Sequence, residues 1–281
     1  MDEVSLSGSH PPCPCLVTFP DSLQKGFSPI RLRRPAASTC STNDSHAQPR
    51  STCRGLYHLP QWYNQNTMLQ DLNPPVLIAR ILTLIVAFTI HEFAHAWTAE
   101  QLGDGTPRLN GRLTLNPLAH LDIFGSLLLL LTGFGYAKPV PVNPYALRRR
   151  TPAGMMLVAA AGPLSNLLLA ILAAIPFKLG LISLNYSIGT FLPNISFLLQ
   201  EFVFINLILL FFNLIPIYPL DGEKVAEYFL PPSGQDTLMR IRPYGPMILM
   251  ALLFLLPMTG FNLFTYLVGW PANRIYTLLI R

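Results

Sequence analysis

The chain contains apolar blocks long enough to cross a lipid bilayer, and these constrain its fold more than any other feature. Three of them fill residues 74–101, 153–177 and 196–215, and a fourth begins at 244–256. A helix needs about 20 mostly apolar residues to cross the bilayer, and it satisfies its own backbone hydrogen bonds there. The sequence therefore predicts an all-α polytopic membrane protein with about four to five transmembrane helices.

Two further apolar stretches are less regular. Residues 121–137 are too short and too rich in glycine for a clean span, so we expect a membrane-dipping segment that continues as extended chain. The extended part, within 133–143, is a weak candidate for an edge that receives substrate. Residues 261–281 are apolar and aromatic, and the sequence leaves open whether they span the membrane or lie in its interface.

The N-terminal part of the chain has a different composition. Residues 1–67 are rich in Ser, Pro and Arg and have no apolar pattern able to form a core. We predict a tail over 1–67 that is either disordered or untranslated, since Met68 would make a sensible start, followed by one membrane domain over 68–281. The tail holds all four cysteines, whose spacing does not match a compact zinc knuckle: Cys13, Cys15, Cys40 and Cys53.

Basic residues are distributed unevenly among the connections. Residues 102–152 include Arg148, Arg149 and Arg150, and residues 218–243 also carry several basic side chains, whereas 178–195 carries only Lys178. Cytoplasmic loops are enriched in Lys and Arg. We therefore expect the first helix to run from outside to cytoplasm in a multi-pass protein of the cell membrane.

The stretch FTIHEFAHAW, residues 88–97, places three ionisable side chains inside the first span. His91 and His95 are four residues apart, so they share one helix face and can bind one Zn²⁺. Glu92 is rotated about 100° from His91, near the metal without needing to ligate it. This HExxH pattern predicts two zinc ligands and a carboxylate that takes a proton from water.

A zinc site of this kind needs a third protein ligand. The extended pattern that would supply a further histidine is absent, because position 101 is Gln. Asp221 is the preferred candidate, since it follows an apolar helix broken by prolines and precedes Gly222. His120, in a loop-like run, is the competing candidate.

Four motifs in order resemble the site-2 protease family of intramembrane zinc metalloproteases: HEFAH at 91–95, GRLTLNPLAHLD at 111–122, AGPLSN at 161–166 and NLIPIYPLDG at 213–222. The resemblance implies that His91, His95 and Asp221 bind zinc and that Glu92 is the catalytic base. It implies that Asn166 faces the site and helps hold the substrate or the oxyanion, although an interhelical hydrogen bond is an equally good interpretation. The short connections imply a minimal form without a PDZ or CBS domain.

The predicted function is hydrolysis of peptide bonds within or near transmembrane segments of membrane proteins. The expected partners are the lipid bilayer and a transmembrane substrate, with no nucleic acid, and the sequence gives no oligomeric state. The alternative is a non-proteolytic membrane protein that binds or transports zinc. Such a protein would not need Glu92 beside the histidines. A membrane di-iron oxygenase would need more histidines than the three in this domain, His91, His95 and His120.

Overall fold

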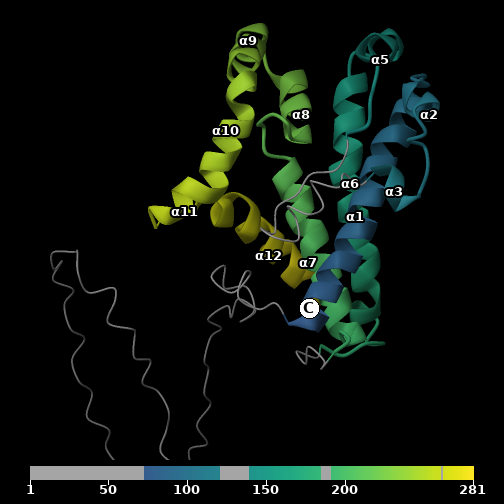
Figure 1. Ribbon diagram of the computed structural model, residues 1–281, viewed down its shortest axis with the longest axis vertical. Helices are drawn as coiled ribbons and strands as arrows, with labels where there is room; N and C mark the ends of the chain where they lie inside the picture. Colours follow the sequence, from purple (N-terminus) through teal and green to yellow (C-terminus); the bar gives the residue numbers. More distant parts are fainter. Residues whose placement is uncertain (1–72, 121–138, 185–190, 261) are drawn as a thin grey trace, which may run out of the picture. The chain divides into compact units, whose positions relative to one another are not determined.

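The computed structural model describes residues 73–120, 139–184, 191–260 and 262–281, which all belong to the compact unit Gly55–Arg281. Every regular element in these ranges is helical (Figure 1). The predicted disordered tail and the predicted membrane-dipping segment at 121–137 lie outside the described residues.

Four helices in the described ranges are long and apolar enough to cross a membrane, judged by length and composition. They are α1 (Pro74–Gln101), α6 (Gly154–Lys178), α7 (Ile195–Asn213) and a continuous run from Pro232 to Met258. The first three agree with the apolar blocks of the sequence to within one or two residues. The prediction of an all-α polytopic membrane protein is thus confirmed.

The fourth span begins earlier than its apolar block suggested. It starts at Pro232 rather than near Tyr244, because its first turns form an amphipathic helix that an apolar scan assigns to the connection. The run consists of α9 (Pro232–Ile241), η2 (Arg242–Tyr244), α10 (Gly245–Met250), the π-helical η3 (Ala251–Leu255) and α11 (Leu256–Met258).

Short helices fill the connections. They are α2 (Thr106–Leu109), α3 (Pro117–His120), α5 (Pro144–Arg150) and α8 (Asp221–Phe229). Helices α2 and α3 contact α1, α5 contacts α6, and α8 contacts both α6 and α9. Helix α8 therefore brings the segment after α7 back against α6.

Residues 139–143 are non-helical and lead into α5. The buried carboxylate of Asp104 accepts a hydrogen bond from the backbone N–H of Asn143 at 2.6 Å, and Asn143 in turn caps α5. This contact fixes the end of the segment that the sequence offered as a substrate edge. Its role as an edge stays a prediction.

The largest apolar core lies between α6, α7 and the C-terminal helix. Small residues of α6, Ala170 and Ala174, allow close approach of Phe204 and Leu207 from α7. The C-terminal stretch forms the π-helical η4 (Thr265–Gly269) and α12 (Trp270–Ile280). Tyr276 of α12 donates a hydrogen bond to Gln200 of α7 at 3.3 Å, so the C-terminal stretch packs against the bundle.

Helix α1 packs against both α6 and α7. Its fully buried alanines, Ala87, Ala96 and Ala99, let neighbouring backbones approach closely. Arg80 of α1 forms an ion pair with the buried Glu201 of α7 at 3.6 Å. These contacts hold the HEFAH stretch of α1 against α6 instead of against lipid.

Candidate metal centre

His91 and His95 lie one turn apart on the buried face of α1. Each is less than a tenth exposed, and their rings meet edge to face with centroids 4.7 Å apart. Glu92 lies between them in sequence and is also buried. Three ionisable side chains are thus enclosed within five residues of one membrane helix, where such groups are usually functional.

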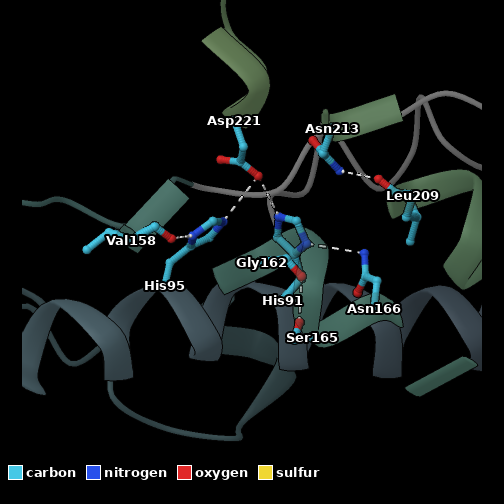
Figure 2. Close-up of polar contacts among 9 residues, drawn as sticks. All are labelled: His91, His95, Val158, Gly162, Ser165, Asn166, Leu209, Asn213 and Asp221. Atoms are coloured by element: carbon cyan, nitrogen blue, oxygen red, sulfur yellow. Dashed lines mark hydrogen bonds and ion pairs between the residues drawn. The ribbon is translucent and has the colours of Figure 1, made fainter. Parts of the chain in front are cut away.

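Asp221 lies far from the two histidines in the sequence, but the fold brings it next to them. It is the first residue of α8, and its Oδ2 atom lies 3.1 Å from His91 Nε2 and 3.4 Å from His95 Nε2 (Figure 2). Within the described ranges, His91, His95 and Asp221 form the group of ligand atoms close enough to share one metal ion. The preferred prediction for the third ligand therefore agrees with the geometry.

His120, the competing candidate for the third ligand, does not lie with the His91–His95–Asp221 group. It is fully buried at the end of α3, where its Nε2 atom lies 2.8 Å from the carbonyl oxygen of Thr114. This contact ties together the run that follows α2. His120 is not part of the group of potential metal ligands.

The three side chains fit a zinc ion. Two imidazoles and one carboxylate are a ligand set used by catalytic zinc sites, which keep a further position open. Ligand atoms about 2.0–2.1 Å from a tetrahedral zinc are about 3.3 Å apart, close to the two nitrogen–oxygen distances of 3.1 Å and 3.4 Å. The neighbours of the buried Asp221 Oδ2 within the described residues are the two Nε2 atoms, so a cation shared by the three atoms would satisfy it.

The charge of Asp221 supports this assignment. Burial alone would raise the pKa of its carboxyl group, but His95 and His91 together lower that pKa below its usual range. Asp221 therefore remains an anionic oxygen ligand at neutral pH.

Gly162 of α6 provides the space that the two imidazoles occupy. A Cβ atom at this position would lie 2.6 Å from Cε1 of His91 and would overlap Nε2 of His95. A glycine inside a helix is about 1 kcal/mol less favourable than alanine. Here the absent side chain is what allows α6 to pack over the histidine face of α1.

Each histidine has a partner on α6 for its second ring nitrogen (Figure 2). Nδ1 of His95 lies 2.7 Å from the carbonyl oxygen of Val158, which can only accept. The proton of this imidazole is therefore on Nδ1, and Nε2 keeps the lone pair that a metal needs. The side-chain amide of Asn166 lies 3.2 Å from Nδ1 of His91.

The Asn166 amide can serve the same purpose for His91. If Nε2 of His91 binds a metal, Nδ1 carries the proton and needs an acceptor. A half-turn of the amide places Oδ1 at Nδ1, and this orientation also gives a partner to Oδ1, which is otherwise buried without one. Asn166 is fully buried and forms the interhelical contact that was one of its two sequence interpretations. A role toward substrate stays a prediction.

The sequence predicted the three clustered residues His91, His95 and Asp221, but it did not predict the roles of Gly162 and of the Val158 carbonyl. Gly162 lay within the quoted AGPLSN motif, and a glycine in the middle of an apolar helix was the available signal. The contact with the Val158 carbonyl could not be predicted, because every residue has a backbone carbonyl and its role does not depend on residue type.

Comparisons with known proteins place these features in a family. Residues 178–256 match the sequence pattern of Peptidase family M50. The chain is 40% identical over 194 residues to YwhC of Bacillus subtilis, named as a candidate zinc metalloprotease, with 68% of this chain and 84% of that protein covered.

More distant relatives agree. Rip2 of Mycolicibacterium smegmatis, also named as a candidate zinc metalloprotease, is 32% identical, with 63% of this chain and 67% of that protein covered. A protein of the same description from Methanocaldococcus jannaschii is 33% identical, with 54% of this chain and 71% of that protein covered. No solved structure matches the chain. These matches show that the chain, with its His91–His95–Asp221 group, belongs to the site-2 protease family, peptidase family M50.

Proposed function

We propose that this protein is a zinc metalloprotease that hydrolyses peptide bonds within or near transmembrane segments of membrane proteins. One observation carries the proposal: two buried histidines of a membrane-length helix meet a partly buried carboxylate in the His91–His95–Asp221 group, and the buried Glu92 follows His91 in the same helix. The names of the relatives support zinc as the metal. The position of the group along α1 supports a substrate that enters the membrane.

The chemistry follows from the side chains present. Bound zinc would supply a Lewis acid that polarises a peptide carbonyl and acidifies water. Glu92 takes the proton from the attacking water and delivers it to the departing amine nitrogen. Val158 and Asn166 keep the imidazoles of His95 and His91 oriented, so that each presents Nε2 to Asp221.

The depth of the site restricts what can be cleaved. His91 lies 10 residues before Gln101, the last residue of α1, which is roughly 15 Å along the axis. Water must therefore reach below the membrane surface. A helical substrate shields its amides through its own hydrogen bonds, so its backbone must unwind locally before a carbonyl reaches Glu92.

The same proposal covers location and organisation. We place the protein in the cell membrane, with the protease in residues 68–281 and with residues 1–67 not needed for activity. Four membrane-length helices within the described residues support an integral membrane protein. A transmembrane protein is the proposed substrate.

The decisive experiment separates proton transfer from metal binding. Purified wild-type protein and Glu92→Gln are compared for zinc content and for cleavage of a model transmembrane peptide. Glu92→Gln should retain about one zinc per chain and lose about 10²–10⁴-fold of the activity, because it keeps its size but cannot act as a base.

His91→Ala is the companion variant and should lose both zinc and activity. A Glu92→Gln protein that cleaves at the wild-type rate would refute the protease proposal. Zinc flux through vesicles containing either Glu92 form would instead support the transport alternative.

A further inference from the structure

The segment that presents Asp221 is held on both sides by the fourth span. Tyr218 lies three residues before Asp221, and Glu223 lies two residues after it. Both contact Arg242, which lies in η2 between α9 and α10. One side chain from the fourth span thus reaches the residues that flank the third metal ligand.

The contact with Glu223 is an ion pair to a buried acid. Arg242 Nε lies 3.4 Å from Glu223 Oε1, and Glu223 is only 3% exposed. Lys224 Nζ approaches the other oxygen, Oε2, at 3.4 Å. Removal of a cationic partner from a buried carboxylate is costly, unlike the loss of an exposed ion pair. Arg242, whose side chain is 40% exposed, is thus one of two cations that hold Glu223, and with it α8, in place.

The contact with Tyr218 holds the chain before α8. The guanidinium carbon of Arg242 lies 5.0 Å from the centre of the Tyr218 ring, a cation–π distance. Gly245 packs so closely on the Tyr218 carbonyl that a Cβ atom there would overlap it. The backbone of the fourth span is therefore in direct contact with the ligand-bearing segment.

The apolar contacts of the same region agree. Ile215 and Leu220, on either side of Tyr218, form a buried cluster with Leu252 of η3 and Val268 of η4. Gly222, next to Asp221, packs against the backbone carbonyls of Leu214 and Ile215 with no space for a side chain. Ordinary packing thus fixes the general course of the segment, whereas Arg242 adds a charged contact on each side of the ligand.

We propose that Arg242 is a positioning residue that holds the Asp221 carboxylate in place for the metal through Glu223 and Tyr218. This inference rests on the proposed function, because it assigns Arg242 a role toward the same zinc site. Arg242 does not touch the metal ligands in this arrangement. Its effect should appear first in metal affinity and only through that in cleavage.

The test measures zinc affinity of the purified full chain by competition with a chromophoric chelator, alongside the thermal unfolding temperature of the metal-free protein. Arg242→Met, which keeps a long side chain without charge, should weaken zinc binding about 10-fold or more, as loss of outer-shell partners typically does. Glu223→Gln should weaken it similarly. Arg242→Lys, which restores the charge, should recover part of the loss.

Two controls separate positioning from general stability. Arg240→Met removes an exposed arginine on α9, two residues before Arg242, and should leave zinc affinity unchanged. The double variant Arg242→Met with Glu223→Gln should bind zinc more tightly than the product of the two single effects predicts, because both substitutions remove the same Arg242–Glu223 contact. Metal-free Arg242→Met should unfold at a lower temperature than Arg240→Met, because it removes a partner of the buried Glu223, but both variants should be folded at the temperature of the zinc assay.

The outcomes are distinct from those that test the protease proposal. Wild-type protein that binds no zinc would contradict the proposed function itself. Wild-type protein that binds zinc while Arg242→Met and Glu223→Gln bind it equally tightly would overturn only the role of Arg242. The role of Arg242 would also be overturned if the loss of zinc affinity in the double variant equalled the product of the losses in the two single variants.

Discussion

Gly162 of α6 lies directly against the imidazole of His95, with no space for even a methyl group between them. The same glycine faces Cε1 of His91. The two helices therefore approach each other at the point where two of the three proposed ligands, His91 and His95, leave α1. The ligand geometry depends on a residue that has no side chain of its own.

Gly162→Ala tests this dependence. The added methyl group must displace both imidazoles, so we expect zinc affinity to fall at least about 10-fold, comparable to the loss of an outer-shell partner. Helix content should not fall, because alanine favours helix over glycine by about 1 kcal/mol. Chelator competition and circular dichroism measure the two effects. Gly105→Ala, at a position with open space, is the matched control.

The identity of the third ligand is tested by a pair of variants. Asp221→Asn exchanges an anionic oxygen for a neutral one and should weaken zinc binding. His120→Ala should leave the metal bound, because His120 contacts Thr114 and not the ligand group. Metal analysis after dialysis against a chelator distinguishes them. Loss of zinc in His120→Ala with tight binding in Asp221→Asn would assign the third ligand to His120.

The role of Asn166 is resolved by comparing two replacements. If its oxygen accepts the Nδ1 proton of His91, Asn166→Ala should weaken zinc binding about 10- to 100-fold. Asn166→Asp should bind zinc more tightly than Asn166→Ala, since it keeps an acceptor at this position. If Asn166→Ala keeps full zinc affinity and loses only cleavage, the asparagine acts on substrate or oxyanion instead.

The membrane orientation is tested with single cysteines in a cysteine-free variant. Leu192 lies exposed in the connection before α7, and Ser233 lies exposed at the start of α9. The excess of basic residues in 102–152 and 218–243 predicts that Leu192→Cys faces outside and Ser233→Cys faces the cytoplasm. An impermeant thiol reagent on intact cells should label the first and not the second. The reverse pattern would invert the orientation.

Much of the fold was available from the sequence, because membrane spans are defined by composition and length. The bounds of α1, α6 and α7 follow from apolar runs alone. The helix of the fourth span begins at Pro232, before the apolar block at 244–256, since the turns of α9 are amphipathic and look like a connection. Hydropathy identifies segments that contact lipid, and the turns of α9 can be helical without contact with lipid.

For the candidate site, too, some parts could be predicted from the sequence and others could not. His91, Glu92 and His95 were predictable because their spacing on one helix is local, and Asp221 because a proline-broken helix end precedes it. The contacts of Arg242 with Glu223 and Tyr218 were not predictable, since they depend on how the fourth span packs against residues 218–223. Arg242 appeared in the sequence only as one positive charge in a cytoplasmic connection.

The separation of the ligands along the chain has a consequence for biosynthesis. His91 and His95 are made with the first span, whereas Asp221 follows only after α6 and α7 have been synthesised. A nascent chain that has inserted α1 therefore holds the histidines without their carboxylate partner. On the proposed assignment, the metal centre is complete only once α8 has been synthesised and has packed against α6. The helices α1, α6 and α7 are therefore made before the protein can hydrolyse a peptide bond.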